Sequence, residues 1–395
     1  MSVNGKIHIV HITQRLEIGG LESFIVELCR NLDKDVFTVS VLCLNGYDEL
    51  YSKHLAEYGV KVHLIKKNSR YDFGFLLRAS AYLKSIGADI IHSHGGCFLY
   101  SSLIGKFAGV KGLVYTVHGM PVTCGLQAWL EEYFSCLMTD RIIAVSDEIA
   151  KDLKNGQRSA ADKIDVIING VDSDRYMPVK DKETITERKS AYGLPLNRKI
   201  IGSVGRLEEV KNYPLLLNAF AKLIHSGRHD CQLVLVGSGR EEIPLKLLAS
   251  DLDIEERVSF LGMQYDLQMI YPLFDVFALP SLTEGTSLSL LEAQSCAVPA
   301  VVTDVGGNSA VIKNGINGYL SPSCNLEAMT AHLALCISCD REMVVMKKAA
   351  RAGILDKFNL TAVLKQYQSL YCELVTPDAV ASFQTVRSEY DISPT

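Results

Sequence analysis

The sequence has no apolar run long enough to cross a bilayer, because no stretch approaches the roughly 20 apolar residues that a spanning helix needs. Its first apolar segment, Ile7 to Ile12, is short and is interrupted by His8 and His11. No small-residue cleavage site follows that segment, so it fits a first β-strand better than a signal peptide. We therefore expect the protein to stay in the cytoplasm.

The sequence also lacks large basic clusters and a cysteine spacing typical of disulfide frameworks or zinc sites. The 40 Lys and Arg are scattered among 45 Asp and Glu, for a net charge of −5, which gives no reason to expect nucleic-acid binding. The 11 cysteines, an odd number at irregular spacing, are typical of reduced thiols. Cys336 and Cys339 form a C-x-x-C, but no second Cys or His pair lies nearby, so packing on a helix face is favoured over zinc.

Short apolar runs alternate with longer helical patterns through residues 1–172 and 199–358. Such alternation is typical of α/β domains in which helices cover both faces of a parallel sheet. The polar stretch 173–198 is predicted to be a linker, and the polar tail, 376–395, is predicted to be flexible. Because ligands bind at the carboxyl ends of parallel strands, we expect two doubly wound domains that face each other across a cleft.

The first segment that suggests chemistry is the loop after the strand-like run Lys199–Val204. Gly205 permits a tight turn, and Arg206 and Lys211 follow, five residues apart, before a helix. A planar guanidinium and a point-charge ammonium suit a pyrophosphate, and the start of the next helix also attracts anions. Taken alone, this spacing favours two solvated loop charges over a binding site.

A second loop follows the strand-like run Val276–Leu279 and also leads into a helix. We expect Gly285 to Leu288 to present free backbone N–H groups at the start of that helix, where anions bind. Glu284 and Glu292 are eight residues apart, about two helical turns, so both are expected to point the same way and to bind sugar or ribose hydroxyls. Seen alone, they are equally consistent with surface charges.

Together the two segments resemble the donor site of glycosyltransferase family 4, whose members are retaining enzymes of the GT-B fold. The matches are the G-R-x-x-x-x-K run at 205–211, the glutamates of 284–292, and the motifs Leu235–Gly239, Phe260–Gly262, Gly306–Asn308 and Asn169–Asp172. The resemblance covers nearly the whole chain, from about Ile7 to about Tyr371.

This resemblance implies an α/β fold of the GT-B type, with two Rossmann-like domains. The acceptor-binding domain would be 1–172, and a final helix at about 361–375 would pack back onto it. The domain that binds the nucleotide sugar would be 199–358.

The resemblance also assigns a role to each site residue. Arg206 and Lys211 would bind the donor diphosphate, Glu292 would bind the ribose, and Glu284 would lie beside the transferred sugar. His118, after the strand-like run Leu113–Val117, would hydrogen-bond the donor sugar. The loop Gly262–Gln264 would lie beside the nucleotide base. The catalytic set is then Arg206, Lys211, Glu284 and His118, and the donor-binding set is Gly20, Gly205, Gly262, Gly285, Thr286, Ser287, Leu288 and Glu292.

Other features of the first half are less determined. Gly19 and Gly20 follow the first strand, and the resemblance places this loop against the donor phosphate and the acceptor. His92 and His94 end a strand, and His94 fits an acceptor contact or a structural role equally well. The apolar stripe of the helix Leu126–Leu137 is interpreted as core packing rather than a membrane-facing surface. The basic residues Lys66, Lys67 and Arg70 fit a solvated loop better than a contact with anionic lipid or with a diphosphate-lipid acceptor.

No D-x-D pair is suited to a catalytic metal, because Asp251 and Asp253 lie in a polar stretch between a helix and a strand. We therefore predict metal independence and no required cofactor, with Arg206, Lys211 and helix-end amides stabilising the leaving diphosphate. The family retains anomeric configuration, by front-face attack in which the departing phosphate takes the acceptor proton. Domain closure would exclude water.

The sequence thus predicts a hexosyltransferase-type enzyme that uses a UDP- or GDP-sugar. The family's commonest roles suggest a lipid-linked or polysaccharide acceptor in bacterial cell-surface glycan synthesis, such as lipopolysaccharide, with peripheral contact at the inner face of the plasma membrane. Three alternatives stay open: a GT-B sugar-nucleotide 2-epimerase, which would need an acid and a base in the cleft, a transferase for soluble sugars, and a catalytically silent scaffold.

Overall fold

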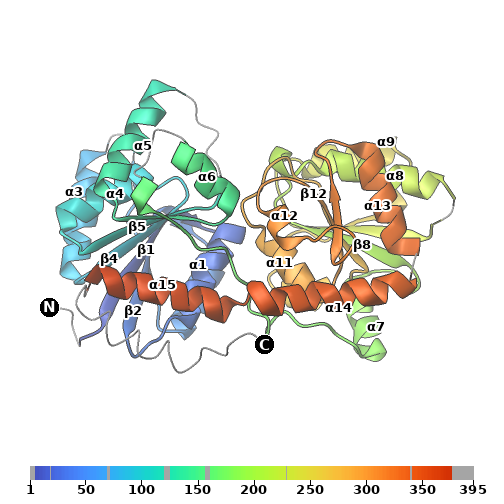
Figure 1. Ribbon diagram of the computed structural model, residues 1–395, viewed down its shortest axis with the longest axis horizontal. Helices are drawn as coiled ribbons and strands as arrows, with labels where there is room; N and C mark the ends of the chain where they lie inside the picture. The colour runs from blue at the N-terminus through green and yellow to red at the C-terminus, as the bar shows by residue number, and fades with distance from the viewer. Residues whose placement is uncertain are drawn as a thin grey trace. The chain divides into compact units, whose positions relative to one another are not determined.

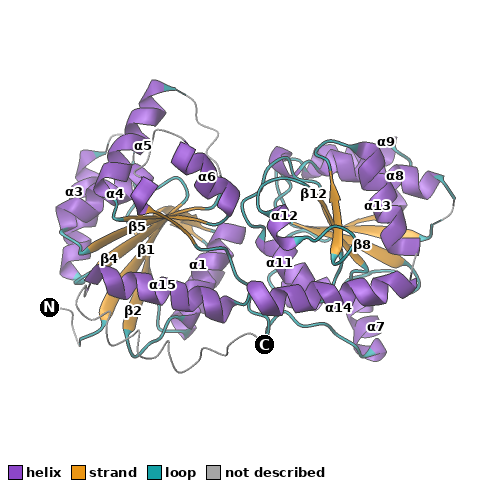
Figure 2. Cartoon of the chain, in the orientation of Figure 1, coloured by secondary structure: helices purple, strands orange, loops and turns teal. Residues whose placement is uncertain are grey.

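The structure is a computed structural model that describes residues 5–17, 19–68, 72–119, 125–155, 161–227, 229–338 and 340–375. The chain forms two compact units, unit 1 with Met1–Ile167 and Ala362–Thr395 and unit 2 with Ile168–Thr361. In each unit, helices lie on both sides of a central sheet (Figure 2). The predicted flexible tail, 376–395, lies outside the described residues.

Unit 1 is built on a seven-stranded parallel sheet in the order β3-β2-β1-β4-β5-β6-β7. Most of its strands are Val- and Ile-rich runs buried on both faces, as strands covered by helices on two sides must be. The strands are β1 (Ile7–Leu16), β2 (Phe37–Tyr47), β3 (Lys61–Leu64), β4 (Ile90–His94), β5 (Gly112–Val117), β6 (Arg141–Ala144) and β7 (Ile164–Val166).

Helices fill the connections between these strands (Figure 1). They are α1 (Gly20–Asn31), α2 (Glu49–Glu57), α3 (Phe73–Ser85), α4 (Phe98–Ala108), α5 (Leu126–Met138), α6 (Asp147–Asn155) and the 3-10 helix η1 (Ala161–Lys163).

The last helix, α15 (Leu360–Val375), belongs to unit 1 from Ala362 onward. Its Tyr371 is fully buried, and the hydroxyl lies 2.6 Å from Nδ1 of His92 on β4. Gly112 permits the close approach of α15 to β5, because a Cβ at that position would lie 3.0 Å from Cβ of Leu374. The C-terminal helix thus forms part of the core of unit 1.

Unit 2 holds a six-stranded parallel sheet in the order β10-β9-β8-β11-β12-β13. Its strands are β8 (Lys199–Val204), β9 (Cys231–Val236), β10 (Val258–Phe260), β11 (Val276–Leu279), β12 (Ala300–Thr303) and β13 (Gly318–Ser321). Its α-helices are α7 (Lys182–Ala191), α8 (Tyr213–His225), α9 (Glu242–Asp251), α10 (Leu267–Ile270), α11 (Leu288–Ser295), α12 (Asn308–Val311), α13 (Leu326–Ser338) and α14 (Asp340–Lys357), and its 3-10 helices are η2 (Glu209–Lys211), η3 (Glu255–Arg257) and η4 (Tyr271–Leu273). Among the described helices, none is both long enough and apolar enough to cross a bilayer.

The stretch 173–198, predicted to be a linker, groups with unit 2. It contains α7, and its Tyr176 and Leu194 are buried in the apolar core of that unit. Arg351 of α14 binds this stretch directly, because its guanidinium donates to the carbonyl oxygens of Tyr176 and Ser173, each at 2.8 Å. The polar composition of this stretch therefore reflects an ordered surface segment around two buried apolar side chains.

Candidate active site

The predicted diphosphate loop follows β8 at its carboxyl end. The loop is fixed to the neighbouring strand connection, since the N–H groups of Gly205 and Leu207 donate to the carbonyl oxygens of Val236 and Ser238, at 3.0 and 2.9 Å. Gly237 makes this contact possible, because a Cβ there would lie 2.1 Å from the carbonyl oxygen of Gly205. The backbone that carries the two predicted cations is therefore rigidly placed.

Arg206 and Lys211 differ in their surroundings. Arg206 is exposed, and within the described part of the chain its side chain has no hydrogen-bond or ion-pair partner. Lys211 extends past Gly205, where a Cβ would lie 3.6 Å from its Cε, and its Nζ lies 2.5 Å from Oε1 of Glu284. The structure thus leaves one cation open and pairs the other with a carboxylate.

The pair Lys211–Glu284 joins the two predicted loops. Both side chains are largely buried, at 17% and 10% exposure, so solvent screens their attraction only weakly. The hydroxyl of Ser281 donates to the same Oε1 at 2.6 Å, and the N–H of Leu282 donates to the carbonyl of Val210 at 2.9 Å. The loops after β8 and β11 therefore form one polar surface.

The spacing of eight residues predicted that Glu284 and Glu292 point the same way from one helix, but the two glutamates do not lie on one helix. Helix α11 begins at Leu288 with Ser287 as its N-cap, so Glu284 lies on the loop before the helix. Glu292 is on α11, is 8% exposed, and accepts a hydrogen bond of 2.6 Å from the Tyr271 hydroxyl. The argument from two helical turns is therefore wrong, and the loop, not helical periodicity, sets the direction of Glu284.

The start of α11 presents backbone donors as predicted. Within the described chain, the N–H groups of Gly285, Ser287 and Leu288 donate to no protein acceptor. The backbone before them is held by the loop after β12, where the N–H of Gly307 donates to the carbonyl of Gly285 at 2.8 Å. Thr286 is fixed from another direction, because Nδ2 of Asn169 donates to its carbonyl at 3.0 Å. These N–H groups form a fixed set of donors for an anion.

Backbone geometry explains why two positions of the predicted motifs are glycine. At Gly306, which has a φ of 55°, a Cβ would lie 1.8 Å from the carbonyl oxygen of Glu284. Gly262 has a φ of 63° and follows β10, and its carbonyl accepts from the N–H of Gly237 at 2.7 Å. The structure thus places the predicted base loop beside the diphosphate loop, within unit 2.

In unit 1, Gly20 begins α1 and is exposed, and a Cβ there would meet no atom within 4 Å. His118 follows β5 and is partly buried, and its Nε2 lies 3.1 Å from Nδ1 of His94. Burial lowers the pKa of His118 to about 4, so its imidazole is neutral at pH 7. His94 itself is fully buried and contacts other imidazoles, which favours the structural role over direct contact with an acceptor.

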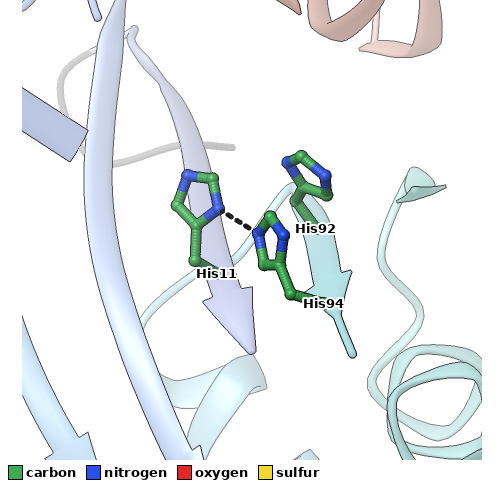
Figure 3. Close-up of side chains that lie close together, drawn as sticks. All are labelled: His11, His92 and His94. Carbon is green, nitrogen blue, oxygen red and sulfur yellow. Dashed lines mark hydrogen bonds between the residues drawn. The ribbon is translucent and has the colours of Figure 1, made fainter. Parts of the chain in front are cut away.

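His11 is a member of this cluster that the sequence analysis did not single out. It is fully buried on β1, and its Nδ1 lies 3.0 Å from Nε2 of His94 (Figure 3). The β-sheet register pairs His11 with His92 on β4, and both nitrogens of His92 bind hydroxyls, of Tyr371 at 2.6 Å and of Thr116 at 2.7 Å. The order of strands 3-2-1-4-5 would have shown that the first and fourth strands are neighbours, but a sequence pattern does not fix that order.

The apolar stripe on α5 is not core, so the sequence interpretation was wrong there. The helix buries its small residues Ser135 and Cys136, and turns its large apolar residues to the surface. The exposed side chains are Leu126, Leu130, Tyr133, Phe134 and Leu137. Of the other side features, Cys336 is buried on α13, whereas Cys339 and Arg70 lie outside the described residues.

A pocket of about 410 Å³ in unit 1 lies away from all of these residues. It opens at the amino ends of β1, β2 and β3 and is lined by Lys6, His8, Lys61, His63 and Tyr82, among others. Because parallel sheets bind ligands at the carboxyl ends of their strands, the side-chain geometry is the better guide to the site than pocket size.

Two family sequence models match the chain. The model described as Glycosyltransferase Family 4 matches residues 18–175, and the model described as Glycosyl transferases group 1 matches residues 184–353. Both sets of predicted site residues fall inside these ranges.

Two similar proteins with assigned activities align with most of the chain. The UDP-Gal:alpha-D-GlcNAc-diphosphoundecaprenol alpha-1,3-galactosyltransferase of Escherichia coli is 28% identical over 392 residues, which cover 95% of this chain and 99% of that protein. The N-acetyl-alpha-D-glucosaminyl L-malate synthase of Bacillus anthracis is 29% identical over 78% of this chain and 81% of its own length.

Solved structures show the same fold. A glycosyltransferase from Rickettsia africae ESF-5 matches with a TM-score of 0.80 at 22% identity, over 94% of this chain and 99% of that one. Anabaena HepE, solved in complex with UDP-glucose, matches with a TM-score of 0.81 at 19% identity, over 92% of this chain and 99% of that one.

Proposed function

The chain belongs to glycosyltransferase family 4, has the GT-B fold and is a glycosyltransferase, and from this premise we propose that it moves a sugar from a UDP-sugar to a lipid-linked acceptor. The single observation that carries the donor assignment is the polar surface formed by the loops after β8 and β11. One exposed guanidinium and one ammonium lie there on fixed backbone, together with the N–H groups of Gly285, Ser287 and Leu288, which donate to no protein acceptor in the described part of the chain. This is the donor set that a diphosphate requires.

The ion pair Lys211–Glu284 suggests how the site changes when the donor binds. In the structure Glu284 neutralises Lys211. A diphosphate is a stronger partner for the ammonium, and transfer of Lys211 to phosphate would free the Glu284 carboxylate to accept hydrogen bonds from sugar hydroxyls. The pair thus keeps both groups in place before the donor arrives.

Transfer itself needs stabilisation of the leaving group. As the glycosidic bond breaks, negative charge grows on the diphosphate, and Arg206, Lys211 and the amides before α11 lie where they would stabilise it. We infer that these groups replace a metal ion and that the reaction retains the anomeric configuration. The departing phosphate would take the proton of the acceptor hydroxyl, so no protein base is needed. His118 is neutral, which suits a hydrogen bond to a sugar hydroxyl.

Glu292 is the proposed ribose ligand. Its carboxylate is buried and one oxygen accepts from the Tyr271 hydroxyl, which fixes its direction. A carboxylate held in this way can accept from a pair of vicinal hydroxyls. The choice of UDP over GDP is supported by the name of the Escherichia coli relative and by the UDP-glucose in the HepE complex.

The acceptor assignment rests on relatives and on one surface of unit 1. The Escherichia coli relative is named for a GlcNAc-diphosphoundecaprenol acceptor. In unit 1, the neighbouring helices α3, α4 and α5 expose large apolar side chains at Phe73, Leu77, Phe107, Leu126, Leu130, Tyr133, Phe134 and Leu137 (Figure 1).

The charge on the α3 and α4 part of this surface fits an anionic membrane. Helices α3 and α4 carry Arg78, Lys84 and Lys106 and no acidic residue, whereas α5 carries Glu131 and Glu132 and no basic residue. Apolar side chains beside cations suit a bilayer of anionic lipids. We therefore expect unit 1 to contact the membrane peripherally at the side where a lipid-linked acceptor is held.

The proposal is tested with purified protein and two assays. A thermal-shift screen of UDP-, GDP- and ADP-sugars should show stabilisation by a UDP-sugar, and if none of the three classes raises the melting temperature the donor site is wrong. A transfer assay with EDTA present should then form glycoside on a polyprenyl-diphosphate sugar. Formation of a new nucleotide sugar without glycoside would indicate an epimerase, and transfer only to a soluble sugar would overturn the lipid-linked acceptor.

A further inference from the structure

Three imidazoles in unit 1 form one hydrogen-bonded chain. Nδ1 of His11 lies 3.0 Å from Nε2 of His94 (Figure 3), and Nδ1 of His94 lies 3.1 Å from Nε2 of His118. The three residues come from β1, from β4 and from the end of β5, which are adjacent in the sheet. The chain of contacts therefore runs from the buried centre of the sheet toward the partly exposed His118.

A neutral imidazole has one N–H and one bare nitrogen, so each link of the chain fixes the next. Burial keeps these rings neutral, since it lowers the pKa of His11 to about 3 and that of His118 to about 4, and holds the pKa of His94 well below its usual value. Only two proton arrangements satisfy both hydrogen bonds. Either every ring carries its proton on Nδ1, or every ring carries it on Nε2.

The buried end of the chain distinguishes the two arrangements. Nε2 of His11 is buried, and among the residues that the structure describes it has no hydrogen-bond partner. If the protons were on Nε2, this atom would be an N–H group buried without an acceptor, and such orphaned donors are rare in proteins. If the protons are on Nδ1, the atom is a bare nitrogen, and His118 turns its Nδ1–H away from the chain.

We infer that His11 and His94 are positioning residues that hold His118 in the Nδ1–H tautomer, so that it presents an N–H donor to a hydroxyl of the donor sugar. This role rests on the proposed function, because His118 matters only if a donor sugar lies beside it. Within the described chain, Nδ1 of His118 has no protein partner, and the residue is only partly buried. The N–H is therefore available to a ligand.

The same rings could instead be considered as metal ligands, because nitrogens of His11, His92 and His94 lie within 4.8 Å of one another. The contacts argue against this. Both nitrogens of His92 bind hydroxyls and both nitrogens of His94 bind imidazoles. The hydrogen-bonded chain explains all of these contacts.

The tautomer of His118 is measured directly by ¹⁵N and ¹³C NMR of histidine-labelled protein, with the signal assigned from its loss in His118→Gln. We expect the Nδ1–H form in the natural protein. In His11→Leu, which removes the first donor, the signal should move toward a mixture of the two tautomers. In His11→Asn, whose amide N–H stands in for Nδ1–H, the Nδ1–H form should return. His8→Gln on the same strand is the control and should leave the signal unchanged.

Steady-state kinetics give the second measurement. With the donor varied, His11→Leu should lower kcat/KM about tenfold through one poorly directed hydrogen bond, and His11→Asn should stay within about twofold of the natural protein. An Nε2–H signal for His118 in the natural protein would overturn the inference. It would also be overturned if the tautomer did not respond to His11→Leu, or if about one zinc ion per chain were bound and then lost in that variant. The NMR result needs no substrate, so it stands or fails separately from sugar transfer.

Discussion

The sheets of the two units carry different kinds of polar group. In unit 1, His11 within β1, His94 at the end of β4 and His118 after β5 form a hydrogen-bonded chain, and burial keeps these imidazoles neutral. In unit 2 the connections after β8 and β11 carry the guanidinium of Arg206, the ammonium of Lys211 and the carboxylate of Glu284. Both units have a parallel sheet with helices on both sides, so the difference in polar groups comes from the side chains that each sheet and its loops carry.

This difference indicates how the work of transfer is divided. A diphosphate needs cations and free N–H groups, and unit 2 supplies both. Sugar hydroxyls are neutral and are recognised by directed donors and acceptors, which neutral imidazoles provide without attracting stray anions. We therefore propose that unit 2 binds the charged diphosphate and that unit 1 adds a neutral hydrogen-bond donor to the recognition of the sugar.

The strongest test removes a charge from unit 2. Lys211→Ala should reduce turnover by about a hundredfold to a thousandfold, because the leaving diphosphate loses a preorganised cation. Lys222→Ala is the matched control, since Lys222 is a half-exposed lysine of unit 2 that pairs with Glu327 on the surface. Turnover is measured as glycoside formed from a radiolabelled UDP-sugar. Near-normal turnover of Lys211→Ala would show that the diphosphate is bound elsewhere.

A second change in unit 2 should affect binding more than chemistry. Glu292→Gln removes the charge that we assign to the ribose and should raise the KM for the donor about tenfold to thirtyfold, with kcat nearly unchanged, as expected for hydrogen bonds to a charged group. Tyr271→Phe keeps the carboxylate but removes its 2.6 Å hydrogen bond, so a smaller rise in KM is expected. A fall in kcat with an unchanged KM would move Glu292 from the ribose to the reacting sugar.

Lowering the pH should affect unit 1 rather than unit 2, by reducing the stability of the unit that contains the buried imidazoles. The pKa of His11 is about 3 in the folded protein and 6.5 when unfolded, so the unfolded state binds the proton first as the pH falls below 6.5. Stability that is fully present above pH 6.5 is therefore lost on acidification, by about 2 kcal/mol for His11 alone at pH 5. Unit 1 should thus unfold at lower urea concentration at pH 5 than at pH 7.

The single tryptophan makes this measurable, because Trp129 lies on α5 of unit 1 and its fluorescence follows that unit. Far-ultraviolet circular dichroism follows both units. If the two signals shift together between pH 7 and pH 5, the acid sensitivity is not confined to unit 1. His11→Asn should reduce the shift of the fluorescence midpoint, because it removes one titrating group from the cluster.

Much of the fold could be predicted from the sequence, for a physical reason. Doubly covered parallel strands must be short continuous apolar runs, and the runs expected near Lys199–Val204 and Val276–Leu279 are β8 and β11. The order of the donor-site motifs along the chain also placed Arg206, Lys211 and Glu284 on strand-to-helix loops, where the structure has them.

The rest depended on contacts that a linear pattern does not contain. Helical periodicity put Glu284 and Glu292 on one face, but the helix starts only at Leu288. An apolar stripe looks the same in sequence whether it meets the core or solvent, so α5 was assigned to the wrong side. His11 was overlooked because its hydrogen-bond partner, His94, is 83 residues away, and only the strand order brings the two together.

The exposed apolar side chains of α5 allow a test of whether unit 1, and not unit 2, contacts the membrane. Leu137 on α5 is 57% exposed and Leu247 on α9 of unit 2 is 62% exposed, so the two leucines are matched in exposure but not in unit. If unit 1 alone meets the membrane, Leu137→Ser should lower binding to vesicles rich in phosphatidylglycerol about threefold, because part of an apolar side chain no longer enters the bilayer interface. Leu247→Ser should leave binding unchanged.

Flotation with vesicles of phosphatidylcholine alone gives the contribution of charge, and binding there should be weaker for every variant. Equal loss in the two serine variants would mean that exposed leucine accounts for the interaction, and not the apolar side chains of α3, α4 and α5 together with the cations of α3 and α4. The membrane would then no longer distinguish unit 1 from unit 2.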